Sequence, residues 1–198
     1  EIVYRQAIAL EPNYTEAHSN LGIVLQGLCN FEEAEIVQRH LISLDPNFIK
    51  AHYNLGNTFQ ELGRLEEAKV SFKQAISLEP DYAESHYNLG NIFKELGRLE
   101  EAEVSFKQAI SLEPDYAESH YNLGNTLQEL GRLEDAEVSF KQAITLNPDY
   151  SAAFNNLGVT LQELGRLEDA EASFKQAIIL NPDYSAAFNN LGVTLQEL

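Results

Sequence analysis

Six asparagines recur along the chain at an interval of 34 residues, and they are its most regular source of polar chemistry. An amide side chain carries two N–H donors and an acceptor oxygen, so it can pair with both the N–H and the C=O of an extended peptide. Stacked at one repeat interval, such amides would form a ladder that holds a polypeptide backbone without reading its sequence. The alternative is a structural role, in which the amides bond to neighbouring helices. The six are Asn20, Asn54, Asn88, Asn122, Asn156 and Asn190.

Four histidines follow the same interval and raise the question of a metal site. Phenylalanine takes their place in the last two repeats, at Phe154 and Phe188, which favours a packed position. Packed helices lie about 8–10 Å apart, whereas a zinc–nitrogen bond measures about 2.0–2.1 Å. One histidine per layer therefore cannot converge on one ion, and we predict core histidines, no metal and no cofactor. The four are His18, His52, His86 and His120.

No arrangement of residues is typical of a catalytic site, so the sequence predicts a protein that is not an enzyme. The carboxylates are distributed, the serines have no convergent histidine, and there is no glycine-rich phosphate loop. Cys29 is the single cysteine, and we interpret it as an inert substitution in a turn. A lone cysteine excludes a disulfide framework and favours a reducing, cytoplasmic (intracellular) compartment.

The 34-residue period indicates the elements that position these side chains. A fixed period between about 20 and 50 residues is the signature of a stacked repeat array. We predict a single array over residues 1–198, with a half repeat at 1–14, full repeats at 15–48, 49–82, 83–116, 117–150 and 151–184, and a half repeat at 185–198. No capping unit is visible, so we expect a segment of a longer polypeptide. The period is marked by Pro12, Pro46, Pro80, Pro114, Pro148 and Pro182, and by Gly22, Gly56, Gly90, Gly124, Gly158 and Gly192.

Each repeat is predicted to form a helical hairpin. Two apolar stripes in residues 49–82 have the spacing of one face of a helix; Gly63 separates them, as a glycine past a helix end does, and Pro80 ends the second. Such a hairpin buries its apolar face only by stacking on its neighbours. The stripes are His52, Leu55, Gly56, Phe59 and Leu62, then Leu65, Ala68, Phe72, Ala75 and Ile76.

The residues at these places resemble the tetratricopeptide repeat family over the whole chain. The resemblance implies an all-α fold, in which antiparallel helix pairs stack into a right-handed superhelix and the first helices line a concave groove. The six asparagines are similar to the asparagine ladder in the superhelix of O-linked N-acetylglucosamine transferase. The carboxylate clamp of other family members needs Lys and Arg, and we reject it because Tyr53 and Asn122 stand at such places. The resemblance is carried by His52, Leu55, Gly56, Phe59, Gly63, Leu65, Ala68, Phe72, Ala75 and Pro80.

The predicted groove changes along the array. Its middle presents tyrosines, which are enriched at binding hot spots, so we expect the ligand to be anchored there. Glutamates on the same helices make the rim acidic, which favours a neutral or basic ligand. The middle of the groove comprises Tyr53, Tyr87, Tyr121, Asn57, Asn91 and Asn125, and the rim comprises Glu61, Glu84, Glu95, Glu118 and Glu129.

The repeat at 15–48 departs most from the others. Gln38 replaces the phenylalanine of Phe72, and Cys29 stands where other repeats have a turn glycine such as Gly63. We therefore expect altered packing, and strain if the turn requires a positive φ. The second helices carry Glu–Lys pairs at i, i+4 on a predicted solvated wall, at Glu103–Lys107, Glu137–Lys141 and Glu171–Lys175.

The charge balance excludes several classes of partner. The chain has 31 acidic and 13 basic residues, a formal charge of −18. It would therefore repel nucleic acid and an anionic membrane surface. No apolar run approaches the roughly 20 residues that a membrane helix needs.

These observations predict a non-catalytic protein–protein interaction scaffold that binds an extended polypeptide in its groove. One alternative is the substrate-docking arm of a larger enzyme, such as a glycosyltransferase or a sulfotransferase. Another is end-to-end self-association, because the two half repeats are complementary and such a contact would propagate as a filament.

Overall fold

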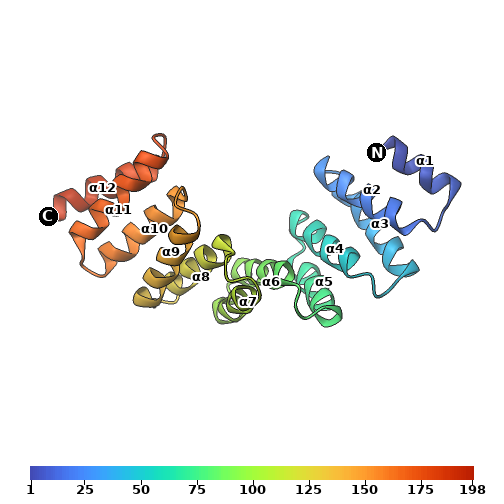
Figure 1. Cartoon of the computed structure of the whole chain (residues 1–198), viewed down its shortest axis with the longest axis horizontal. Helices are drawn as coiled ribbons and strands as arrows, with labels where there is room; N and C mark the ends of the chain where they lie inside the picture. The colour runs from blue at the N-terminus through green and yellow to red at the C-terminus, as the bar shows by residue number, and fades with distance from the viewer. The chain divides into compact units, whose positions relative to one another are not determined.

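The computed structural model describes all residues 1–198, and its twelve elements are all α-helices (Figure 1). The chain forms two compact units, residues 1–98 and 99–198. Unit 1 contains α1 (Ile2–Leu10), α2 (Thr15–Gly27), α3 (Phe31–Leu44), α4 (Ile49–Glu61), α5 (Leu65–Leu78) and α6 (Ala83–Glu95). Unit 2 contains α7 (Leu99–Leu112), α8 (Ala117–Glu129), α9 (Leu133–Leu146), α10 (Ser151–Glu163), α11 (Leu167–Leu180) and α12 (Ser185–Glu197).

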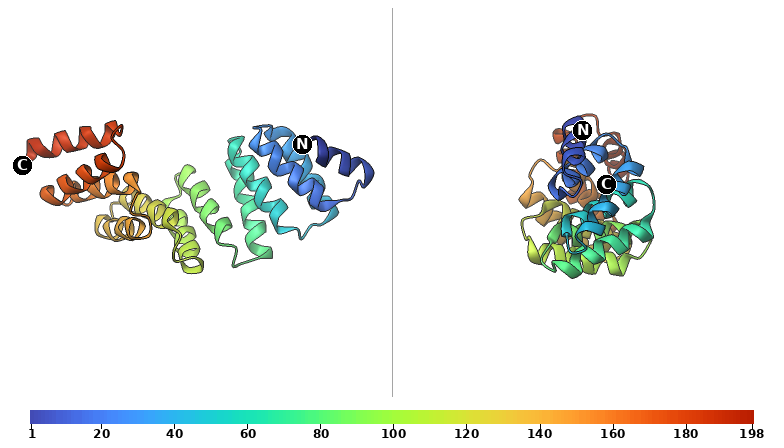
Figure 2. Two further views of the ribbon diagram at one scale, coloured as in Figure 1. Left: turned by 45° about the horizontal axis from the view of Figure 1, so that its top comes forward. Right: turned by 90° about the vertical axis from the view of Figure 1, so that its right-hand side faces the viewer.

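Helices that follow each other in the chain pack together within each unit (Figure 2). The pairs α2–α3 and α4–α5 in unit 1, and α8–α9 and α10–α11 in unit 2, are the predicted hairpins. Each second helix also packs on the first helix of the next repeat, as α3 does on α4 and α9 on α10. The predicted all-α fold of stacked helix pairs is confirmed. None of the helices is both long and apolar enough to cross a membrane.

The two helices of a hairpin approach each other through a glycine and a phenylalanine. Phe72 of α5 is fully buried, and a Cβ added to Gly56 of α4 would lie 2.6 Å from a carbon of its ring. Gly158 of α10 and Phe174 of α11 repeat this contact, also at 2.6 Å. The glycine at this place is therefore fixed by packing against the second helix.

The turn between the helices of a hairpin requires a left-handed backbone. Gly63 has a φ of 69°, and the N–H of Arg64 donates to the carbonyl of Phe59 at 2.8 Å, closing the end of α4. Cys29 adopts a φ of 57° at the same place and is the one non-glycine residue with a positive φ. The expectation of a strained turn at Cys29 is confirmed, since a Cβ disfavours this conformation.

Packing in the divergent repeat also differs as expected. Gln38 of α3 occupies the place of Phe72 and is completely buried, yet its Nε2 and Oε1 atoms form no hydrogen bond. A buried polar group without a partner is costly. The first hairpin therefore buries two unpaired polar atoms where the next hairpin buries the ring of Phe72.

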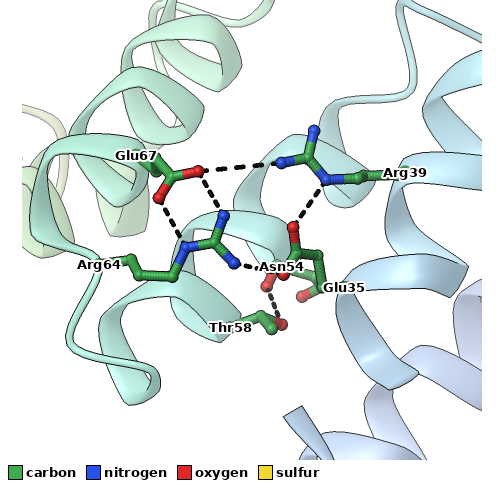
Figure 3. Close-up of polar contacts among 6 residues, drawn as sticks. All are labelled: Glu35, Arg39, Asn54, Thr58, Arg64 and Glu67. Atoms are coloured by element: carbon green, nitrogen blue, oxygen red, sulfur yellow. Dashed lines mark hydrogen bonds and ion pairs between the residues drawn. The ribbon is translucent and has the colours of Figure 1, made fainter. Parts of the chain in front are cut away.

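Ion pairs link the second helices of neighbouring repeats (Figure 3). Arg64 donates to Glu35 of the preceding repeat at 2.5 Å and also to Glu67 of its own helix pair, while Arg39 pairs with Glu35 at 2.8 Å. Unit 2 repeats this arrangement with Arg166 and Glu137 at 2.8 Å. The sequence predicted only the pairs along one helix, and these are present too, as Glu103–Lys107, Glu137–Lys141 and Glu171–Lys175.

Candidate functional site

In unit 1, a ladder asparagine joins two consecutive first helices. Asn88 of α6 donates through Nδ2 to the hydroxyl of Tyr53 at 3.1 Å and to Oδ1 of Asn57 at 2.9 Å, both on α4. These two bonds use both N–H groups of its amide. Its oxygen remains available to accept a hydrogen bond from a ligand.

Unit 2 repeats this contact between α8 and α10. Asn156 donates to the hydroxyl of Tyr121 at 3.1 Å and to Oδ1 of Asn125 at 2.7 Å. Asn155 donates to the oxygen of Asn156 at 3.0 Å and accepts from Asn190 of α12 at 3.0 Å. Here the amides form a connected chain between helices, which is the structural role that the sequence left open.

Two ladder amides in unit 1 have no such partners. The side chains of Asn20 on α2 and Asn54 on α4 form no hydrogen bond, although Asn54 is only 8% exposed. For Asn54 the reason lies in α2, where Ser19 and Ile23 stand at the places of Tyr53 and Asn57. The groups that hold Asn88 are therefore missing for Asn54.

The remaining predicted groove residues lie on the same face of the first helices. The half-buried Tyr87 and Asn91 of α6 and Asn122 of α8 all have interaction partners. The structure thus places every predicted groove residue on the first helices, and it distinguishes amides occupied by the fold from those that are not.

A hollow of about 610 Å³ opens between α2 and α4 beside the unoccupied amide of Asn20. We call it the α2–α4 hollow. It is lined by Thr15, Glu16, Ser19, Asn20 and Ile23 of α2, by Asn47, Phe48, Ile49 and Lys50 at the start of α4, and by Glu79 and Tyr82 between α5 and α6. Its walls combine apolar and charged side chains, as ligand sites commonly do.

The next repeat fills the equivalent space with its own ring. Tyr53 packs against Tyr82 with ring centroids 5.1 Å apart, and against Phe72 at 5.9 Å. Burial, together with the nearby Tyr53 phenol and glutamates, raises the pKa of Tyr82 to about 12. Its hydroxyl is therefore a neutral group at physiological pH.

The histidines connect each first helix to the loop before it. The ring Nε2 of His52 donates to the carbonyl of Pro46 at 2.9 Å, and that of His18 donates to Pro12 at 2.8 Å. His86 and His120 bond to Pro80 and Pro114 in the same way. No group of three or more His, Cys, Asp or Glu side chains lies close enough together to hold a metal ion.

The sequence interpretation missed Ser19 and Ile23 as features of the site. The signal was available, because each departs from the residue type of the three repeats that follow. The sequence did not predict that these two residues leave a hollow, because the hollow depends on side chains from α2, α4 and the loop before α6.

The amino-acid sequence matches models of known protein families over most of its length. Models described as tetratricopeptide repeat match residues 15–48, 38–70, 117–150 and 151–184, and a model described as TPR repeat matches residues 56–97 and 90–131. The chain belongs to the tetratricopeptide repeat family. Membership of this family supports a role as a protein-interaction scaffold.

Solved structures of tetratricopeptide repeat proteins share the fold. YrrB, described as a TPR protein with an unusual peptide-binding site, is 24% identical, with 98% of each chain covered and a TM-score of 0.80. MamA is 24% identical over 81% of this chain and 94% of its own, with a TM-score of 0.78. PilF of Pseudomonas aeruginosa is 20% identical over 93% of this chain and 90% of its own, with a TM-score of 0.76. No curated protein sequence matches the chain.

Proposed function

We propose that the chain is an interaction module that binds an extended polypeptide along its first helices. The observation that carries this proposal is the α2–α4 hollow, where the unoccupied amide of Asn20 lies beside apolar walls. Asn54 supplies a second unoccupied amide one repeat further on. Both can bond to a peptide backbone in two directions, while Asn88 and Asn156 can only accept, because the fold uses both of their N–H groups. The role is one of binding, with no catalytic step.

The ligand that fits this face is neutral or basic. The formal charge of the chain is −18, and Glu16 and Glu84 lie on first helices without an ion-pair partner. An acidic peptide would be repelled, whereas Lys and Arg side chains would be attracted at low ionic strength.

The test is the affinity of labelled, unstructured peptides, in basic, neutral and acidic series, measured by fluorescence anisotropy. We expect the basic and neutral series to bind, and the double variant Asn20→Ala, Asn54→Ala to bind about thirtyfold or more weakly, since two hot-spot contacts worth more than about 1 kcal/mol each add up to more than about 2 kcal/mol. Neither amide holds the fold together by a side-chain hydrogen bond, so this variant is expected to stay folded.

The matched control is Gln74→Ala, an exposed position on α5. It should bind like the wild type. Equal affinity of the folded double variant and the control for every peptide would refute the groove as the binding site.

A second candidate function is self-association through α12. In α10, Leu161 is 2% exposed and Gly158 contacts the ring of Phe174. In α12, the equivalent Leu195 is 52% exposed, and a Cβ on Gly192 would meet nothing within 4 Å. Sedimentation at increasing concentration tests it: Leu195→Glu should abolish any association, and a monomer at all concentrations would exclude it.

A further inference from the structure

The α2–α4 hollow lies where the chain omits an aromatic ring that it supplies in later repeats. The tilted rings of Tyr53 and Tyr82 pack together in the next repeat with centroids 5.1 Å apart, and those of Tyr121 and Tyr150 do so in unit 2 with centroids 4.7 Å apart. Ser19 stands at this place in α2, so Phe48, the equivalent of Tyr82, has no ring beside it. The space is therefore shaped by neighbours that elsewhere pack on tyrosine.

The hydrogen-bond partner of the missing ring is also present and unused. Asn88 reaches the hydroxyl of Tyr53, 35 residues earlier in the chain, at 3.1 Å. Asn54 holds the same relation to Ser19, one repeat beyond the residues of α2 that line the hollow, and its side-chain amide forms no hydrogen bond within the protein. Gln26 donates to the backbone oxygen of Asn54 at 2.8 Å and leaves that amide free. An amide that has no partner within the protein keeps two N–H donors and an acceptor oxygen for a guest.

The charges around the hollow favour a guest residue that is flanked by basic residues in its own chain. Glu16 and Glu79 line it and face only one cation of the lining, Lys50. Neither glutamate takes part in an ion pair, and the whole chain is strongly acidic. Lys or Arg on either side of the inserted residue would complement these carboxylates.

We propose that the α2–α4 hollow binds one tyrosine side chain, flanked by basic residues, of the polypeptide that the groove holds. The guest ring packs against Phe48 in place of the ring missing at Ser19, and its hydroxyl accepts a hydrogen bond from the amide of Asn54. The partner's tyrosine thus makes the contacts that a tyrosine of the chain itself makes in other repeats. This subsite rests on the proposed function and defines its specificity.

The experiment compares three labelled peptides that differ at one position, with the sequences Gly-Gly-Lys-Tyr-Lys-Gly-Gly, Gly-Gly-Lys-Phe-Lys-Gly-Gly and Gly-Gly-Lys-Ala-Lys-Gly-Gly. We expect the tyrosine peptide to bind about tenfold or more tightly than the alanine peptide, and about threefold or more tightly than the phenylalanine peptide, because one neutral hydrogen bond separates the last two. Asn54→Ala should remove the preference for tyrosine over phenylalanine and keep the preference for either over alanine.

The decisive variant is Ser19→Tyr, which supplies the missing ring from the chain itself. It should abolish the preference for tyrosine over alanine and raise the midpoint of thermal unfolding, because the ring gains the contacts that Tyr53 makes in the next repeat. The control is Ser77→Tyr, at an exposed position on α5, which should leave the preference unchanged.

The outcomes separate the subsite from the function on which it rests. Equal binding of the three peptides to the wild type, or an unchanged preference in folded Ser19→Tyr, overturns the subsite and leaves the groove proposal standing. No binding of any peptide overturns both. Both proposals are supported if the wild type and Ser77→Tyr prefer the tyrosine peptide and if Ser19→Tyr and Asn54→Ala reduce that preference.

Discussion

The orphaned amide of Gln38 makes a quantitative prediction about stability. Its two polar atoms are fully buried without partners, at the place where the next repeat buries Phe72. Gly22 is retained opposite, so the space that admits a ring elsewhere is available here. We therefore expect Gln38→Phe to stabilise the protein.

The magnitude follows from the two unpaired atoms. Leaving a buried polar group unsatisfied costs about 1–3 kcal/mol, so removing both should add about 2 kcal/mol or more to the free energy of unfolding. The reciprocal variant Phe72→Gln introduces the same defect into a well-packed repeat and removes a ring. It should cost about 3 kcal/mol or more, since loss of a buried Phe side chain alone costs about 3–5 kcal/mol.

The assay is urea unfolding followed by far-UV circular dichroism, with amide hydrogen exchange to locate the change. Stability in a repeat array is a sum of local and neighbour terms, so the added protection in Gln38→Phe should be greatest in α2 and α3. The replacement Gln74→Phe, on the exposed face of α5, controls for the effect of an added ring. Unchanged or lower stability in Gln38→Phe, with Phe72→Gln behaving as expected, would refute the inference that the unpaired amide of Gln38 destabilises the protein.

Two further predictions concern packing and charge. Gly158→Ala should destabilise by about 1–3 kcal/mol, because its Cβ would overlap a buried ring. Gly192→Ala, in an identical stretch of sequence, should be neutral or stabilise by up to about 1 kcal/mol, and equal unfolding midpoints for the two variants would contradict the packing argument. Hydrogen bonds from Lys141 and Arg166, which outweigh burial, hold the pKa of Glu137 below its ordinary value of 4.5. The stabilising effect of the Glu137 carboxylate is therefore complete above about pH 4.5 and is lost as the pH falls through the lowered pKa. The difference in thermal midpoint between the wild type and Glu137→Gln should vanish in acid. A difference that persists in acid would exclude the ion pairs as its source.

Sequence alone determined the repeat architecture and its local geometry. The 34-residue period set the hairpins, and Gly63 marked the turn that the structure closes with a φ of 69°. These features are local, because helix periodicity and a left-handed turn each depend on a few adjacent residues. The unusual turn at Cys29 and the altered packing at Gln38 were visible for the same reason, as departures from a pattern that the chain itself defines.

Tertiary structure alone decided which amides the fold occupies. Six asparagines in equivalent places look alike in sequence, yet the side-chain amide of Asn88 bonds to Tyr53 and Asn57, whereas that of Asn54 bonds to no other side chain. The partner of each lies on the preceding first helix, 31 or 35 residues away, and it exists only if that helix carries the right side chain. Ser19 and Ile23 remove it in one repeat and leave a hollow there. A hydrogen bond depends on distance and direction in space, and these are fixed only when neighbouring repeats pack together.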